Sequence, residues 1–364
     1  MPERVLVAMS GGVDSSMAAA CLAAQGLDVV GVTLHLWDYP DDGSVRGRCC
    51  APEDVYDARR VADALHIPHY AFDRRELFAR EVVEPFVDGY VAGETPSPCV
   101  RCNRGVKIRE LVDLAESLGA ARVATGHYAR IGHDGDRPYL MRARDITKDQ
   151  SYFLHMLGPD VLRRLVFPLG DKTKSEVRSE AGRLRLPGAD KGESQELCFV
   201  PTGRYTSFVA ERASGRLRPG PIVDEAGQIV GNHEGIHAFT LGQRKNLGVS
   251  LGRRSYVVAL DADSGRVKLG PREQLLCRSL RLREVVLAHG WSLPLSCEVA
   301  VRYRAEPVGA ELRPLSEDEV EVSFEKPVVA AAPGQFAVFY RGDRVLGGGL
   351  IRGTRADSRL RGVA

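Results

Sequence analysis

A chain of 364 residues is too long for a single small core, so we expect two or three domains. Its apolar content of 44% and charged content of 27% are typical of a water-soluble globular protein. The net charge of +2 is too small to indicate a polyanionic partner by itself, and no apolar stretch has the length of a membrane span, so we expect a cytoplasmic protein without membrane association.

The first element is the apolar run Val5–Met9, which predicts a buried parallel strand. Ser10, Gly11 and Gly12 form a tight turn after it, and a strong helical pattern is under way from Met17. A strand, a glycine turn and a helix in this order aim backbone N–H groups and the positive end of a helix at an anion, usually a phosphate. The turn lacks the Gly-Lys-Ser/Thr ending of a Walker A loop and the Gly-x-Gly-x-x-Gly of a dinucleotide-binding loop.

The segment Ser10–Ser16 resembles instead the loop of the PP-loop ATP pyrophosphatases, enzymes that adenylate a carbonyl oxygen and release diphosphate. This resemblance implies that the loop holds the phosphates of ATP. Asp14 is then a candidate contact for Mg²⁺, which prefers carboxylate oxygens. The alternative is an ordinary strand–helix turn capped by serines.

Strands and helices alternate through the next hundred residues. We expect strands over 28–37, 67–72 and 122–127, and helices over 53–65, 74–91 and 106–118, with a distortion at Pro85. This alternation predicts a parallel sheet covered on both faces, with ligands beyond the carboxyl ends of its strands. Both the glycine turn and the segment 125–127 follow such strand ends.

The expected secondary structure changes in the later part of the chain. We expect a hairpin strand over 136–141 and mostly helix over 148–186, followed from about residue 204 by short β runs rich in Gly and Pro. The sequence therefore predicts an α/β, parallel-sheet PP-loop domain over 1–204, a small β-rich module over 205–276 and a C-terminal β-barrel-like domain over 277–364.

Eight cysteines in a reducing compartment point to metal or sulfur chemistry. We expect Cys99 and Cys102 on a proline-stiffened turn before a helix, whose dipole would stabilise a thiolate, and Cys198 alone in a loop. Three interpretations remain open: a zinc site of Cys49, Cys50, Cys99 and Cys102, an iron–sulfur site of Cys99, Cys102 and Cys198, or a persulfide pair that includes Cys198. Spacing alone favours a metal site, although a second Cys-x-x-Cys pair is missing.

Over essentially its full length the chain resembles the bacterial tRNA-specific 2-thiouridylases, which convert the 2-carbonyl of the wobble uridine in tRNA to a thiocarbonyl. The resemblance rests on residues 10–16, 49–55, 98–103, 124–128, 148–154, 197–199, 240–245 and 302–304. Each of these motifs is weak alone, but their order along the chain is specific.

The resemblance implies roles for individual residues. Cys102 would be the nucleophile and Cys198 the persulfide carrier, loaded by a cysteine desulfurase or a sulfur-relay carrier, and the two could close an alternate disulfide. Predicted ATP contacts are Ala8, Met9, Ser10, Gly11, Gly12, Val13, Asp14, Ser15, Leu34 and Gly126. Predicted tRNA contacts are Lys148, Asp149, Gln150, Arg302 and Tyr303. The expected cofactors are ATP and Mg²⁺. Cys99 stands where some members of the family have aspartate, which keeps an iron–sulfur cluster open as an alternative.

Two other functions compete with this one. A PP-loop ligase would use the same loop but leave the cysteines without a role, and a zinc-stabilised RNA-binding protein would need no catalysis. His127 stays unassigned, since a histidine at a strand end is as often structural as catalytic.

Overall fold

The computed structural model describes residues 2–38, 52–189, 197–200 and 204–354. The chain divides into two compact units. The first comprises residues 1–83, 99–204 and 342–345, and the second comprises residues 84–98, 205–341 and 346–364. Cys49 and Cys50, and with them the proposed four-cysteine zinc site, lie outside the described residues. None of the described helices combines the length and the hydrophobicity that crossing a membrane requires.

A parallel sheet with the strand order β3-β2-β1-β4-β7 forms the centre of the first unit. Its strands are β1 (Arg4–Ala8), β2 (Asp28–His35), β3 (His69–Asp73), β4 (Arg122–Ala124) and β7 (Leu165–Val166). Val5, Leu6 and Val7 of β1 are fully buried, as expected for a strand covered on both faces. Because β1 pairs with β2 on one side and β4 on the other, the strand order reverses there, which is where such sheets bind ligands. The predicted parallel sheet is confirmed.

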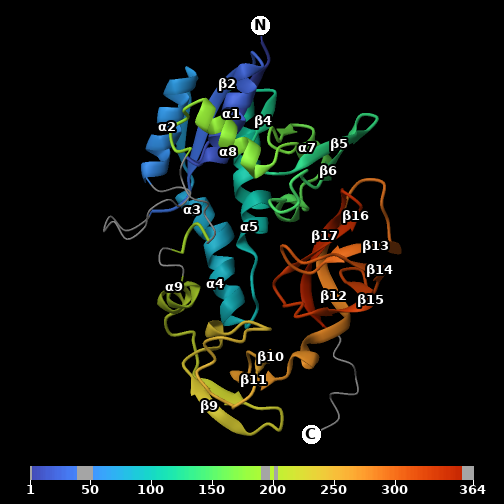
Figure 1. The fold of residues 1–364 in the computed structure, drawn as a ribbon. Helices are drawn as coiled ribbons and strands as arrows, with labels where there is room; N and C mark the ends of the chain where they lie inside the picture. The colour runs from blue at the N-terminus through green and yellow to red at the C-terminus, as the bar shows by residue number, and fades with distance from the viewer. Residues whose placement is uncertain (1, 39–51, 190–196, 201–203, 355–364) are drawn as a thin grey trace. The chain divides into compact units, whose positions relative to one another are not determined.

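Helices of this unit flank the sheet (Figure 1). They include α1 (Val13–Ala24), α2 (Pro52–Leu65), α6 (Ile108–Ser117) and α8 (Lys174–Arg183). The small side chains of Ala18 and Ala19 are fully buried, so α1 packs closely against β2 and α8. The helix therefore holds its N-terminus in a fixed position at the end of β1.

The helical run around Pro85 is distorted as expected. It consists of α3 (Arg75–Phe78), a π-helical segment η1 (Ala79–Val83) and α4 (Glu84–Val91). Pro85 has no N–H to donate to the preceding turn, and the chain responds by widening that turn rather than by ending the helix.

The segment with Cys99 and Cys102 is helical, so its predicted placement on a turn is wrong. The helix begins with α5 (Pro98–Arg101), passes through a π-helical segment η2 (Cys102–Lys107) and continues as α6. Proline is well suited to the first turn of a helix, where its missing N–H would have no partner in any case. The prolines that suggested a turn thus mark the start of the helix.

The expectation of mostly helix over 148–186 is only partly met. The structure has a 3₁₀ turn η3 (Ser151–Leu154), the short helix α7 (Pro159–Leu162), the edge strand β7 and then α8. The pair Gly158-Pro159 and Pro168 interrupt the helical pattern, and the apolar residues between them add a strand to the sheet. The predicted hairpin is confirmed as β5 (Arg130–Asp134) paired with β6 (Arg137–Met141).

The second unit contains the small β-rich module. Its strands are β8 (Gly220–Val223), β9 (Ile229–His233), β10 (Tyr256–Asp261) and β11 (Arg266–Gly270), in the order β10-β11-β8-β9. Ile222, Val257 and Val267 form its core. The sequence did not predict the helix α9 (Tyr205–Arg212) before these strands, nor the 3₁₀ turns η4 (Ile236–Ala238) and η5 (Arg272–Leu275).

The predicted C-terminal barrel is also confirmed. Its strands are β12 (Leu276–Leu287), β13 (Leu295–Ala300), β14 (Val308–Pro314), β15 (Val320–Val329), β16 (Phe336–Arg341) and β17 (Arg344–Thr354). They follow the order β12-β15-β14-β13-β16-β17, and β12 pairs with β17 to close the ring. Closure leaves no exposed strand edge along these strands.

Candidate functional site

The glycine turn at the end of β1 is shaped by two close approaches. Gly11 has a φ of +69°, and a Cβ there would lie 2.5 Å from the carbonyl oxygen of Asp54. Gly12 is the N-cap of α1 and has no side-chain cap. Only glycine fits at position 11, and the first N–H groups of α1 are left for a ligand of negative charge.

The hydroxyls of Ser15 and Ser16 hold this turn together. Ser15 Oγ accepts a hydrogen bond from the Ser10 N–H at 3.1 Å and donates to the Gly12 carbonyl at 3.0 Å. Ser16 Oγ also donates to the Gly12 carbonyl at 3.0 Å. Backbone N–H groups, rather than the hydroxyls of Ser15 and Ser16, are therefore the donors that the turn can offer to a phosphate.

The end of β4 lies directly against the start of α1. A Cβ at Gly126 would lie 2.7 Å from the backbone nitrogen of Ser15 and 2.8 Å from the carbonyl carbon of Asp14. Leu34, near the carboxyl end of β2, is buried at the same edge of the sheet. The structure thus brings together the predicted ATP contacts of residues 8–15, Leu34 and Gly126.

The sequence missed a lysine that faces this turn. The ammonium Nζ of Lys174 lies 2.6 and 2.7 Å from the two carboxylate oxygens of Asp14, and the Tyr128 hydroxyl donates to Asp14 at 2.9 Å. Lys174 is buried, follows the Thr173 N-cap of α8, and donates its backbone N–H to Asp145. Lys174 and Asp14 are 160 positions apart in the sequence, so their pairing could not be read from it. The one sequence signal for Lys174 was the Lys-Thr-Lys pattern at the start of a helix.

Asp14 is consequently engaged by protein groups. A metal ion at this carboxylate would have to share it with the Lys174 ammonium. Within the described ranges, no three His, Cys, Asp or Glu side chains gather closely enough to hold a metal ion. The expected Mg²⁺ contact of Asp14 stays a prediction.

Two of the predicted tRNA contacts, Asp149 and Gln150, are engaged inside the first unit. The carboxylate of Asp149 accepts hydrogen bonds from the Ala143 N–H at 2.9 Å and the Ser151 hydroxyl at 2.8 Å, and burial raises its pKa. The side chain of Gln150 accepts the Tyr128 N–H at 2.9 Å. The Gln150 side chain therefore supports Tyr128 and hence Asp14, while Lys148 beside it is half-buried.

His127 is held in its neutral form. Its Nδ1 lies 2.8 Å from the Thr125 hydroxyl. Burial, together with the nearby Lys107 ammonium, lowers its pKa to about 3. At neutral pH the imidazole therefore carries no charge.

Cys102 is a buried thiol at the start of the π-helical segment. Burial raises its pKa, against the opposing effects of the Lys107 ammonium and of a hydrogen bond from the Lys107 backbone. The expected stabilisation of its thiolate by the helix dipole is therefore outweighed, because the thiol lies inside the protein instead of at an exposed helix end. Cys99, three residues earlier, is exposed.

The residue that follows Cys198 packs against α3, a helix that the segment beginning at Cys102 also contacts. This residue, Phe199, is fully buried and packs edge-on against Phe78 of α3 at 5.6 Å and Trp37 after β2 at 6.2 Å. The π-helical segment that begins at Cys102 also contacts α3. No disulfide joins Cys102 to Cys198 in this structure. Phe199 thus lies beside Trp37, which follows the carboxyl end of β2, and Cys198 precedes Phe199 in the chain.

Arg302 and Tyr303 belong to the second unit and lie on a turn between β13 and β14. Arg302 is exposed and Tyr303 is half-buried. The Arg304 guanidinium lies 5.1 Å from the centre of the Tyr303 ring, and Arg304 has a φ of +62°. Their predicted contact with tRNA is not tested by this geometry.

Three sequence families match successive parts of the chain. The tRNA methyl transferase HUP domain family matches residues 3–202, the tRNA methyl transferase PRC-barrel domain family matches residues 206–271, and the aminomethyltransferase beta-barrel domain family matches residues 278–351. Together they span nearly all of the chain.

Individual relatives match along nearly their whole length. A tRNA-specific 2-thiouridylase MnmA from Sorangium cellulosum is 62% identical over 354 residues, which cover 96% of this chain and 92% of the relative. The chain belongs to the tRNA-specific 2-thiouridylase family. Relatives of the same name from Paramagnetospirillum magneticum and Heliobacterium modesticaldum are 48% and 46% identical, covering 96% of this chain and 95% and 93% of their own lengths. Membership in the 2-thiouridylase family confirms the resemblance that the sequence motifs indicated.

Proposed function

We propose that this chain is a tRNA 2-thiouridylase, which uses ATP to adenylate the 2-carbonyl of the wobble uridine and then replaces that oxygen with sulfur. The observation that carries the proposal is the glycine turn at the N-terminus of α1 in the same unit as Cys102 and Cys198, since the segment that begins at Cys102 and the neighbour of Cys198, Phe199, both contact α3. The names of its relatives supply the substrate class.

The first step activates the base. The 2-carbonyl oxygen of uridine attacks the α-phosphorus of ATP, and diphosphate leaves. The backbone N–H groups after Gly12 would hold the phosphates, and the buried Lys174 ammonium supplies positive charge beside them. Mg²⁺ would accompany ATP rather than be bound by a dedicated set of protein ligands, since the described side chains offer no such set.

The second step delivers sulfur. A persulfide on Cys198, loaded by a cysteine desulfurase or a relay carrier, attacks C2 through its terminal sulfur, and AMP leaves with the former carbonyl oxygen. The Cys102 thiolate then attacks Cys198 Sγ, which releases 2-thiouridine and leaves a Cys102–Cys198 disulfide. Alternatively, Cys102 attacks the persulfide first and releases sulfide, which attacks C2. Either route requires two electrons from an external thiol to reduce the disulfide.

Thiolation of an unmodified tRNA tests this function. The assay supplies ATP and a persulfide-loading desulfurase, and measures diphosphate, AMP and 2-thiouridine separately. Cys198→Ser and Cys102→Ser should form diphosphate but no 2-thiouridine, because the activation step, which releases diphosphate, does not need either thiol. Formation of 2-thiouridine by Cys198→Ser at the wild-type rate would refute the persulfide role.

Cys99→Ser is the matched control, since Cys99 lies on the same helix as Cys102 but is exposed. In the persulfide mechanism this variant keeps its thiolation activity. In the iron–sulfur alternative it loses both activity and the iron and sulfide that anaerobically purified protein would contain.

A further inference from the structure

A basic loop in the small β-rich module has no part in the chemistry described above. It runs from Gln243 to Ser255 and includes part of the motif Thr240–Lys245 that the sequence comparison singled out. Its start is fixed by reciprocal backbone hydrogen bonds, from Gly242 N–H to the Val257 carbonyl at 2.8 Å and from Val257 N–H to the Gln243 carbonyl at 2.9 Å. Leu247 is buried in the module's core. The loop is therefore a fixed part of the module's surface.

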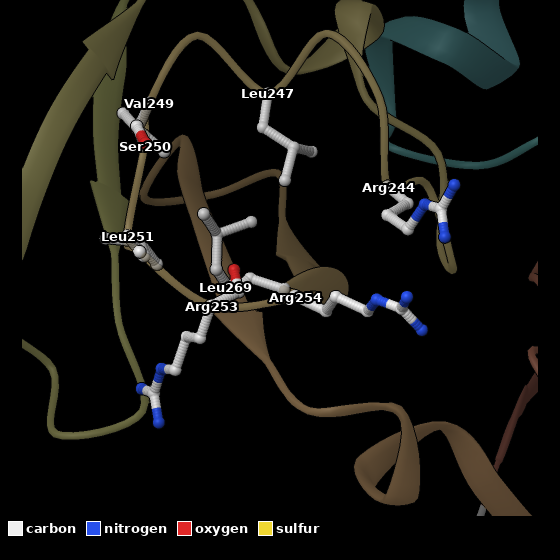
Figure 2. A pocket seen from close by; sticks show the side chains of 10 residues that line it. Arg244, Leu247, Val249, Ser250, Leu251, Arg253, Arg254 and Leu269 are labelled. Carbon is white, nitrogen blue, oxygen red and sulfur yellow. Dashed lines mark hydrogen bonds between the residues drawn. The ribbon is translucent and has the colours of Figure 1, made fainter.

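This loop lines an open hollow of about 520 Å³ (Figure 2). Leucine and valine side chains, including Leu247, Val249 and Leu269, form part of its lining, and arginines form its rim. None of the lining residues is acidic or aromatic. The hollow therefore offers positive charge around an apolar surface, without a ring on which a base could stack.

The charge of the loop is one-sided. Residues 243–255 include four basic side chains and no acidic one. Arg253 forms an ion pair with Glu225 at 2.7 Å. Arg244, Lys245 and Arg254 are exposed, and no carboxylate in the described part of the chain pairs with them. Figure 2 shows that Arg244 and Arg254 extend toward the same side of the hollow, whereas Arg253 points away from them.

Such an arrangement is suited to an anion with several charges in a row. Neighbouring cations repel each other, and a bound anion removes this repulsion. Guanidinium groups also bind phosphate oxygens in a bidentate manner. Phosphodiester contacts of this kind set the affinity and the orientation of a nucleic acid without reading its sequence. The absence of aromatic residues from the lining agrees with contact to the backbone rather than to splayed bases.

We propose that Arg244 and Arg254, with Lys245, bind the phosphodiester backbone of the RNA substrate. This inference rests on the proposed function, because it takes RNA to be the substrate. It assigns to the small β-rich module a contribution to tRNA affinity that is separate from the bond-making steps.

The test compares Arg244→Gln/Arg254→Gln with wild type. Fluorescence anisotropy gives the Kd for unmodified tRNA over a series of KCl concentrations, and steady-state thiolation gives kcat and KM. Removal of two phosphate contacts should weaken binding roughly tenfold at moderate salt and reduce the slope of log Kd against log[KCl] by about 1 to 2. The value of kcat at saturating tRNA should not change.

Arg266→Gln is the matched control, because Arg266 is an exposed arginine of the same module that does not line the hollow. It should leave both Kd and the salt slope close to wild type. A double variant with wild-type Kd and slope would overturn the inference, as would an equal effect of Arg266→Gln. If wild type itself neither binds nor thiolates tRNA, the proposed function fails instead, so the two failures are distinguishable.

Discussion

Replacing Lys174 with methionine removes an ammonium group that the structure directs at Asp14 in the first turn of α1. Methionine keeps an unbranched apolar chain in the buried space, so the change is mainly one of charge. Two consequences are expected, one for folding and one for ATP, and their magnitudes differ enough to be separated.

The folding consequence is moderate. Asp14 would keep the Tyr128 hydroxyl at 2.9 Å, and its side chain is 34% exposed, so water can solvate part of the carboxylate. Loss of one partner of a fully buried pair costs about 3–5 kcal/mol and loss of an exposed pair about 0–1 kcal/mol, so we expect about 1–2 kcal/mol here.

The consequence for ATP is larger. Two unit charges about 4 Å apart interact by about 4 kcal/mol at an effective dielectric constant of about 20. Since the turn is open to solvent, we expect about half of this, so kcat/KM for ATP should fall roughly 30-fold. The assay is tRNA-dependent formation of AMP from ATP, with urea unfolding measured in parallel.

Lys172 provides a matched control. Its ammonium lies 2.7 and 2.8 Å from the carboxylate oxygens of Glu180, on the same segment of the chain but not against the glycine turn. Lys172→Met should therefore lower the free energy of unfolding by a similar or smaller amount and keep AMP formation. If Lys174→Met forms AMP within threefold of wild type, or if Lys172→Met loses as much activity, Lys174 has only a structural role.

Three further predictions concern a glycine, a thiol and a histidine. Gly126→Ala brings a Cβ within 2.7 Å of a backbone nitrogen of α1, so we expect the ATP affinity measured by calorimetry to fall roughly tenfold. Gly182 has open space around it, so Gly182→Ala should keep that affinity and stabilise α8 by about 0.5–1 kcal/mol. Iodoacetamide should alkylate Cys102 slowly at pH 7 and faster up to above pH 9, because burial raises the pKa of the thiol; Lys107→Gln should move this profile, followed by mass spectrometry, to higher pH. Burial lowers the pKa of His155 to about 4, so below pH 6.5 the unfolded chain binds a proton that the folded chain does not. The stability that is present above pH 6.5 is therefore lost as the pH falls, by up to about 2 kcal/mol at pH 5 in urea unfolding. His155→Gln should lose less stability over the same pH range.

Each of these predictions has an outcome that contradicts it. Equal ATP affinity of Gly126→Ala and wild type would mean that the loop after β4 moves without cost. A rate of Cys102 alkylation that is already constant from pH 7 upward would mean that the thiol is ionised at rest. Identical losses of stability between pH 7 and pH 5 in wild type and His155→Gln would assign the acid sensitivity to other groups.

The parts of the fold that the sequence predicted are those in which neighbouring residues determine the outcome. The run Val5–Met9, the turn at Gly11 and the small residues of α1 are consecutive, so their strand, turn and helix follow from local preference and burial. The same holds for the alternating strands of the barrel.

Features that depend on distant contacts were not predictable in the same way. The ion pair between Asp14 and Lys174 joins residues 160 positions apart, and neither residue marks the other in the sequence. Likewise, nothing in the sequence indicates that the carboxylate of Asp149, a tRNA contact implied by the family resemblance, accepts hydrogen bonds from backbone N–H groups and a hydroxyl within the protein. Tertiary packing, rather than composition, decided both.

The π-helical segment that begins at Cys102 is local in sequence, but its effect on the thiol could not be predicted from the sequence. In an α-helix the N–H of residue 106 would lie closest to the turn that begins at Cys102, but a π-helix has one more residue in each turn. Lys107 is thereby brought to Cys102, with both its backbone hydrogen bond and its ammonium opposing the effect of burial on the thiol pKa. No composition signals a π-helix, so a buried cysteine with a lysine five residues later reads in the sequence as an unrelated pair. In the structure the widened turn makes them neighbours, and this is how a thiol inside the protein keeps a group beside it that favours its reactive, deprotonated form.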